Sequence, residues 1–328
     1  MTLKQDFFHT IRFLGRKTTT GETYWGHCSD FFVWMRDHIG EGEWIHPRDA
    51  GRGEIEAWLT DMATARHLSP KSQNQALQGV LFLYHRVLKR QIENVDAIRS
   101  KENRITIKDV LSPDEVSAII GQLRGVNKLV IQLLYAGAMR RSDVLQLRLK
   151  ELHFDTKQIA LKETKHGHQH WTLFPESLHS PVRCQMKKVD RLWQADLEDN
   201  PSGVSLPHAF RRKSPKAANQ LAWYYLFPSG NLSACPETGI IARHHRDAGH
   251  VNRSLGEAAR RAGVLKRVTS HILRHSSATH MHQAGVPMRD LQQILGHSSI
   301  STTETYVHSD TSVTKRVKSP IDSLPKAG

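Results

Sequence analysis

The chain has 328 residues and a marked excess of positive charge, with 46 Lys and Arg against 32 Asp and Glu and a formal net charge of +14. Such a chain attracts polyanions, which favours a nucleic acid as its partner. Hydrophobic residues make up 38%, enough for soluble cores, and no window approaches the roughly 18 uninterrupted apolar residues of a membrane span. The composition therefore disfavours a membrane protein.

Targeting and thiol signals point to a cytoplasmic protein. The three cysteines lie far apart and form no CxxC pair, which indicates reduced thiols and neither a disulfide framework nor a zinc site. The N-terminal segment has no long apolar run and no small-residue cleavage site. We therefore predict no signal peptide.

Residues 1–90 are predicted to form a helical bundle. Apolar residues recur at helical spacing within 18–38, and a second helix is expected at 53–66. Ser69 followed by Pro70 is a helix start signal, because the hydroxyl caps the helix and proline suits its first position. That helix ends in Lys89 and Arg90, which we take as candidate DNA contacts.

A change of composition separates this bundle from a second domain. Residues 96–110 are polar and weakly periodic, which predicts a linker after a first domain at 1–95. Ser112 with Glu115 then forms a capping-box pattern that opens a new helix. Residues 127–136 predict an apolar helix, and a further short helix is expected around Val144 and Leu147.

Residues 158–174 predict a β-hairpin. Ile159 and Leu161 alternate on one side, Trp171 and Leu173 lie on the other, and a glycine relieves the turn. Lys165 would then stand at the hairpin tip.

The rest of the chain is predicted to be helical, with one irregular insertion. Helices are expected at 182–198, 250–262 and 271–307. Residues 199–240 are rich in Pro, Ser, Gly and aromatic residues, which indicates an irregular segment inserted between helices. The basic, proline-broken end of the chain predicts an arm.

The segment 271–306 gathers groups suited to phosphodiester chemistry. A phenol such as Tyr306 can attack phosphorus, and Arg274 can hold phosphoryl oxygens in a two-pronged grip. The imidazoles of His271 and His297 can move protons near neutral pH. No glutamate lies between His271 and His275, as a zinc protease helix would require, and no carboxylates are paired as in a two-metal nuclease. We therefore expect no metal and no cofactor.

The chain resembles the tyrosine recombinases, the phage-integrase family, from about residue 10 to its end. The motifs that carry this resemblance, in chain order, are Gly137-Ala-Met-Arg140, Thr164-Lys165-His166-Gly167, His271-Ile-Leu-Arg274-His275, Leu295-Gly296-His297 and Thr305-Tyr306-Val307-His308. The resemblance implies a mostly helical α+β fold. Its parts would be an N-terminal helical, SAM-like core-binding domain and a mixed α/β catalytic domain at 111–308 with a small antiparallel sheet.

The resemblance also implies a role for each of the six catalytic candidates. Arg140 and Arg274 would hold the non-bridging phosphoryl oxygens, and Tyr306 would become a 3′-phosphotyrosine. Lys165 would protonate the leaving 5′ oxygen, His271 would assist proton transfer at the tyrosine, and His297 would donate a hydrogen bond to the phosphoryl group. Read singly, Lys165 could be a solvated turn lysine and either histidine a core residue or a helix cap.

Residues 203–246 lie between the lysine and the His271 motif, and in this respect the chain resembles the integron integrases of the family. They carry an insertion like residues 203–246 and are understood to bind folded single-stranded hairpin sites as well as duplex attachment sites. The positions implied to contact protruding bases are Pro236, Arg243, His244 and His245. Trp223 and Tyr224 are possible stacking partners, and the alternative for Trp223, Leu226 and Phe227 is a small satellite core.

Two residues depart from the family pattern. Asp143 stands where glutamate is more frequent, which keeps the charge on a shorter side chain. Ser277 stands where phenylalanine is common, which predicts looser packing under the site.

The resemblance implies a homotetramer on paired sites in a bacterial cytoplasm, with residues 309–328 docking on a neighbour as a C-terminal arm. The implied function is insertion and excision of gene cassettes by a metal-independent strand transferase that closes around DNA. The alternatives are a recombinase that resolves dimers at duplex sites, a DNA-binding protein with an inactive site, and a topoisomerase of the same chemistry.

Overall fold

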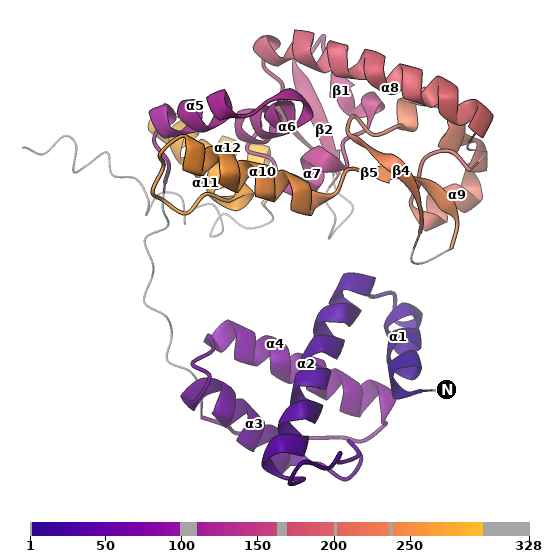
Figure 1. The fold of residues 1–328 in the computed structure, drawn as a ribbon, viewed down its shortest axis with the longest axis vertical. Coiled ribbons are helices and arrows are strands. Elements are labelled where there is room, and N and C mark those ends of the chain that lie inside the picture. The colour runs from indigo at the N-terminus through magenta and orange to yellow at the C-terminus, as the bar shows by residue number, and fades with distance from the viewer. Residues whose placement is uncertain (1, 99–109, 163–168, 200–201, 236–238, 298–328) are drawn as a thin grey trace, which may run out of the picture. The chain divides into compact units, whose positions relative to one another are not determined.

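The computed structural model describes residues 2–98, 110–162, 169–199, 202–235 and 239–297, and the chain divides into two compact units at 1–106 and 107–328 (Figure 1). The expected hairpin tip at Lys165, the helix after residue 297 and the arm at 309–328 lie outside the described residues. No described helix combines the length and apolarity needed to cross a bilayer.

Every regular element in the described part of the first unit is a helix, as predicted. Its helices are α1 (Leu3–Phe13), α2 (Thr18–His38), α3 (Arg52–Thr64) and α4 (Pro70–Phe82), which continues as a π-helical turn over Leu83–Val87. Ser69 caps α4 by accepting a hydrogen bond from the Ser72 backbone N–H, with Pro70 at the first helical position.

Aromatic side chains form the centre of this unit. The Phe7 ring meets the rings of Trp25 and Phe82 edge-on, each with a centroid separation of 5.2 Å. Trp58 is fully buried, and its indole N–H donates a hydrogen bond to Asp30. The apolar stripe that the sequence predicts for α2 lies in this core, with Cys28, Phe31 and Met35 buried.

The second unit begins with three helices: α5 (Pro113–Gln122), α6 (Gly125–Ala136) and α7 (Arg141–Leu145). Ser112 and Glu115 form the expected capping box at α5. A three-stranded antiparallel sheet follows, with β1 (Leu152–His153), β2 (Gln158–Lys162) and β3 (Gln169–Leu173) in the order β1-β2-β3. Ile159 pairs with Thr172, and Leu161 pairs with His170.

The face of the sheet that packs on the core contains fewer apolar side chains than the alternation in the sequence predicts. Ile159 and Leu161 are buried on β2, as expected, but on β3 the buried residue is Thr172. Trp171 and Leu173, each 45% exposed, lie on the outer face. The core side of β3 therefore carries polar residues, His170 and Thr172, which the apolar alternation does not reveal.

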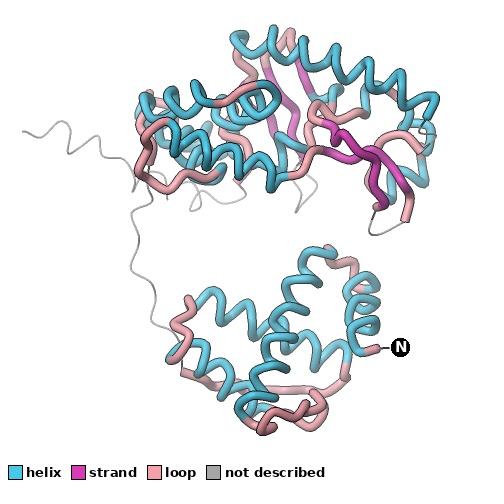
Figure 2. The backbone as a smooth tube through the Cα atoms, in the orientation of Figure 1, coloured by secondary structure: helices cyan, strands magenta, loops and turns pink. Residues whose placement is uncertain are grey.

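The long helix α8 (His179–Asp199) leads into the insertion, and Figure 2 shows that this segment contains strands. Residues 199–240 were expected to be irregular, yet β4 (Pro228–Ala234) pairs antiparallel with β5 (Ile241–His245), next to the short helix α9 (His208–Lys213). The sequence PSGNLSA hides β4 because backbone pairing, and not side-chain alternation, makes it a strand.

The described part of the second unit ends with the helices α10 (Ala248–Arg261), α11 (Ser270–Gln283) and α12 (Met288–Leu295). They pack with α5 and α6 beside the sheet (Figure 1). The main core of this unit reaches from α5 to α11 and includes Tyr224–Phe227 from the insertion. A small satellite core was the alternative for Trp223, Leu226 and Phe227, but Leu226 and Phe227 belong to the main core and Trp223 packs against it. The expected fold class, mostly helical with small antiparallel sheets, is confirmed.

Candidate active site

Arg140 stands at a tight turn between α6 and α7. Ala138 adopts a left-handed conformation with φ of 45°, which turns the chain so that Arg140 begins α7. The Arg140 backbone N–H donates to Asp143 Oδ2 at 3.2 Å. The Arg140 side chain is 42% exposed, whereas that of Asp143 is 8% exposed. The shorter acid at 143 therefore fixes the backbone of the turn and leaves the guanidinium accessible.

Arg274 lies under this turn and is 3% exposed. Its Nη1 donates to the carbonyl oxygen of Ala138 at 2.7 Å, and its Nη2 donates to the carbonyl oxygen of Leu295 at 2.8 Å. One planar guanidinium thus joins the α6–α7 turn to the C-terminal end of α12. A buried charge held by fixed carbonyl groups stays where a phosphate would need it.

His297 follows immediately after α12. Its Nε2 lies 3.2 Å from Arg274 Nη2, and because arginine has no acceptor, the imidazole nitrogen accepts this hydrogen bond. Burial, followed by the nearby charges of Arg274, Arg140 and His170, lowers the pKa of His297 to about 4. The ring is therefore neutral at neutral pH, with its proton on Nδ1.

His271 lies in the first turn of α11 and is exposed. It precedes Arg274 by three residues, so both residues lie on the same side of the helix. Of the six catalytic candidates, the structure brings Arg140, Arg274 and His297 into one cluster, with His271 on the helix that carries Arg274. Lys165 and Tyr306 lie outside the described residues.

Ser277 does not leave the expected loose packing. It is 3% exposed, and its hydroxyl donates a hydrogen bond to the carbonyl oxygen of Tyr135 on α6. One turn further along α11, His280 Nδ1 lies 2.7 Å from the Tyr135 hydroxyl. A hydrogen bond thus fastens α11 to α6 at the position where an aromatic side chain was expected.

The candidate DNA contacts of the first unit differ in their surroundings. Lys89 is exposed at the end of the helix that begins at Pro70. Arg90 is also exposed, but its Nη1 donates to the carbonyl oxygens of Arg48 (2.8 Å) and Ala50 (2.5 Å). Arg90 therefore fastens the chain around residues 48–50, whereas the neighbouring Lys89 is exposed to solvent.

Arg243 has a structural environment. It is 6% exposed, and its Nε and Nη2 donate to both carboxylate oxygens of Asp196 on α8. Its Nη1 donates to the carbonyl oxygens of Ser229 and Gly230 on β4. The guanidinium is therefore committed to holding the insertion on α8, which corrects the expectation that it faces DNA.

Tyr224 is likewise unsuited to stacking on a base. It is 1% exposed, and its hydroxyl donates to Asp196 at 3.2 Å. Burial, followed by the charge of Asp196, raises the pKa of this phenol above its ordinary range. Asp196, Arg243 and Tyr224 form one buried network that the sequence analysis did not predict, because its members are far apart in the chain.

His244 and His245 are both half-buried at the end of β5. Burial, followed by the charge of His245, lowers the pKa of His244 and favours its neutral form. The His245 ring meets the Tyr225 ring edge-on with a centroid separation of 5.5 Å. Pro236, which was grouped with these residues, lies outside the described part of the chain.

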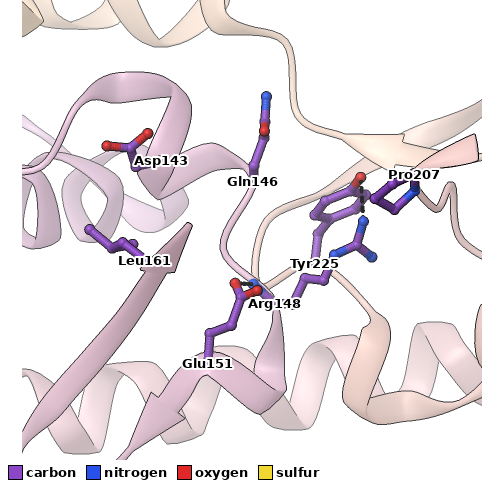
Figure 3. Close-up of a pocket in the computed structure, with 7 residues that line it drawn as sticks. All are labelled: Asp143, Gln146, Arg148, Glu151, Leu161, Pro207 and Tyr225. Atoms are coloured by element: carbon purple, nitrogen blue, oxygen red, sulfur yellow. Dashed lines mark hydrogen bonds between the residues drawn. The ribbon is translucent and has the colours of Figure 1, made fainter. Parts of the chain in front are cut away.

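Arg148 joins the insertion to the catalytic helices and was missed by the sequence analysis. Its Nη2 donates to the carbonyl oxygen of Ser205 at 2.9 Å and to the Tyr225 hydroxyl at 3.0 Å. Figure 3 shows Arg148 beside Tyr225 in a polar pocket of about 120 Å³ that also includes Asp143 and Glu151. Tyr225 of the insertion and Asp143, whose carboxylate holds the Arg140 turn, line this same pocket.

A second, larger cleft of about 420 Å³ lies on the insertion itself. The rings of Phe210 and Trp223 stack in it with a centroid separation of 4.3 Å, and Lys150 Nζ lies 3.0 Å from the centre of the Trp223 ring. Lys213 and Lys216 also line this cleft. Aromatic faces beside ammonium groups are typical of sites that accept flat anionic ligands.

Residues 109–312 match the model of the phage integrase family, and residues 3–94 match its N-terminal SAM-like domain. The chain belongs to the phage integrase family. It is 37% identical over 315 residues to an "Integrase/recombinase" of Escherichia coli, over 96% of this chain and 91% of that protein, and equally to one of Pseudomonas aeruginosa. A "Tyrosine recombinase XerD" of Oceanobacillus iheyensis, 24% identical over 326 residues, is among its further relatives.

Solved structures share the fold at low identity. The Tn1549 transposon integrase in complex with transposon right end DNA aligns with a TM-score of 0.58 at 17% identity, over 96% of this chain and 98% of that one. The XerH site-specific recombinase bound to its difH substrate aligns with a TM-score of 0.57 at 17% identity, over 97% of this chain and 85% of that one. At this identity, the likeness concerns the fold of the recombinase.

Proposed function

We propose that this recombinase is an integron integrase, which inserts and excises gene cassettes by cutting and rejoining DNA at folded hairpin and duplex sites. The observation that carries the strand-transfer part is the position of Arg274, held between the Arg140 turn and the end of α12. The insertion at 203–246, fastened to the catalytic domain by Arg148 and Arg243, supports the integron type.

The proposed reaction begins with attack of the Tyr306 oxygen on phosphorus. The bond to the 5′ oxygen breaks, Lys165 supplies the proton to that oxygen, and His271 assists removal of the phenol proton. Arg140 and Arg274 offset the charge on the non-bridging oxygens, for which planar guanidinium groups are well suited. A second 5′-hydroxyl then attacks the phosphotyrosine, so the bond energy is kept and neither ATP nor a metal is required.

His297 must change its bonding partner during this sequence. In the free protein its Nε2 accepts from Arg274, so this nitrogen carries no proton to give. A phosphate between Arg140 and Arg274 would counter the positive charges that lower the His297 pKa. Binding of the scissile phosphate is therefore expected to protonate His297 and make it the hydrogen-bond donor that the reaction needs.

The aromatic cleft of the insertion supports recognition of bases that protrude from a folded strand. A base stacked on a side-chain ring contributes about 1–3 kcal/mol, and the lysines around Trp223 attract the neighbouring phosphates. His244 and His245 lie on β5 of the same insertion, directly after the buried Arg243 on that strand. We assign the base contacts to the aromatic cleft together with His244 and His245. Arg243 and Tyr224 stabilise the insertion from inside through their hydrogen bonds to Asp196.

The remaining parts follow the domain division proposed from the sequence. Residues 1–95 would form the core-binding domain, residues 96–110 the linker and residues 111–308 the catalytic domain. Four copies would assemble on two paired sites, each passing its arm at 309–328 to the next copy. Head-to-tail docking of this kind closes into a ring.

Two measurements test this proposal. Protein mixed with nicked site DNA should form a covalent adduct that survives detergent and chelator and is lost in Tyr306→Phe; an adduct in the phenylalanine variant contradicts the nucleophile. The folded bottom strand of a cassette site should be recombined in preference to its duplex. Equal use of both forms would favour a dimer-resolving recombinase.

A further inference from the structure

His170 on β3 lies directly against Gly296, the residue before His297. A Cβ built on Gly296 would lie 2.6 Å from His170 Cε1 and 2.7 Å from both ring nitrogens. Real Cβ atoms do not approach other atoms so closely, so only glycine leaves room for this ring. Gly296 also has φ of 61°, which ends α12 in the left-handed conformation.

The same face of β3 contacts the other side of the site. Thr172 is 2% exposed, and its hydroxyl donates to the carbonyl oxygen of Gly137 at 2.6 Å. Gly137 belongs to the turn that leads to Arg140. Two neighbouring inward residues of one strand, His170 and Thr172, therefore contact the two segments that Arg274 also joins.

Three groups from three different elements act electrostatically on His297. Arg274 on α11 lies within hydrogen-bond distance of it, and the charges of Arg274, of Arg140 at the start of α7 and of His170 on β3 lower its pKa after burial itself. Both ring nitrogens of His170 are covered from solvent. The His170 ring therefore forms part of the wall that keeps water from the His297 side of the site.

We propose that His170 is a positioning residue for strand cleavage: its ring, wedged against Gly296, sets the position of His297 and fixes the catalytic hairpin to the end of α12. The inference rests on the proposed function, in which His297 and the hairpin lysine act on one phosphate. His170 acts through His297 and does not itself touch the reacting atoms.

The experiment compares His170→Ala and His170→Phe with the wild-type protein. Single-turnover adduct formation on nicked DNA is measured at saturating protein, together with DNA affinity. The pKa of His297 is followed by NMR of histidine-labelled protein, with the missing signal of His297→Asn as the assignment. Leu173→Ala is the matched control, because it removes a side chain from the exposed face of the same strand.

In His170→Ala the adduct rate should fall by about tenfold or more, as expected when a catalytic group is displaced. DNA affinity should stay within about twofold, since no phosphate contact is removed. The pKa of His297 should rise toward its ordinary value because the ring becomes more solvated. His170→Phe keeps a flat ring and should retain more activity than alanine. Leu173→Ala should change neither the pKa nor the rate.

An unchanged His297 pKa and an unchanged adduct rate in folded His170→Ala would overturn the inference. Absence of an adduct with wild-type protein would instead overturn the proposed function. The His297 pKa measured by NMR would still test whether the His170 ring, packed against Gly296, sets the surroundings of His297. A double-mutant cycle gives an independent reading. Gly296→Ala should lower the melting temperature less in the His170→Ala background than in wild type, and equal losses in both backgrounds would also count against the wedge.

Discussion

The guanidinium of Arg274 donates a 2.7 Å hydrogen bond from Nη1 to the carbonyl oxygen of Ala138, a residue 136 positions earlier in the chain. Ala138 is also the left-handed residue of the turn that presents Arg140. A single buried side chain thus fixes the turn that carries Arg140 relative to Arg274. The site is built to hold positive charge before any ligand arrives.

Replacing Arg274 by lysine should abolish most cleavage while leaving the protein folded. Lysine keeps the charge, but a single ammonium cannot reach the carbonyl groups of Ala138 and Leu295 and still face a phosphate. We expect single-turnover cleavage to fall about 10²- to 10³-fold, the usual effect of losing a preorganised donor. Arg289→Lys, on the exposed side of α12, is the control and should cleave normally.

Acid should destabilise the free protein partly through His297. The folded pKa of about 4 lies below the ordinary value of 6.5, so between these values the unfolded chain binds a proton that the folded protein excludes. The stabilisation is present above pH 6.5 and is lost as the pH falls toward 4. Melting temperatures measured across this range should fall more steeply in wild type than in His297→Asn, and parallel curves would contradict a depressed pKa.

Removing the charge of Asp196 should loosen the insertion. Asp196→Ala leaves the buried guanidinium of Arg243 without its carboxylate, which costs about 3–5 kcal/mol when one partner of a buried pair is lost. Hydrogen exchange should increase over β4 and β5, because Arg243 also holds the β4 carbonyl groups. Asp199→Asn, at the exposed end of the same helix, should change neither exchange nor stability.

Gly203→Ala should be damaging for a different reason. Gly203 has φ of 62°, and an added Cβ would lie 2.3 Å from the backbone oxygen of Ala218. Backbone cannot move aside as a flexible side chain can, so we expect a loss of at least about 2 kcal/mol in thermal unfolding. Gly256→Ala on α10 is the contrast: no atom lies within 4 Å of the new Cβ. Alanine should there stabilise the helix by about 0.5–1 kcal/mol.

Local signals explain why much of the fold was predictable. Ser69 and Ser112 cap the helices that the sequence assigned to them, since capping depends on residues three positions apart. The apolar stripe of α2 is buried for the same reason: helical geometry alone places those side chains on one face. β4 escaped prediction because its seven residues include only two apolar ones, and its partner strand determines its conformation.

The candidate site shows a similar division. Gly137-to-Arg140 and Leu295-to-His297 were assigned from their motifs, and the structure places both beside Arg274. His170 was not predicted as a site residue because the apolar alternation of β3 rests on Trp171 and Leu173, which lie on the opposite face of the strand. The available signal was the face with His170, where polar residues point toward the site.

The sequence alone determined where helices begin, which apolar helix faces are buried and which residues have the chemistry for phosphodiester exchange, because these properties depend on neighbouring residues and on functional groups. The tertiary structure alone decided which charged side chains are available. Arg140 is accessible to solvent, whereas Arg243 is buried in an ion pair with Asp196. The residues next to each arginine in the sequence do not indicate which of the two is buried. The difference arises because burial and pairing depend on distant segments, here α8, whose Asp196 meets Arg243 only in the folded chain.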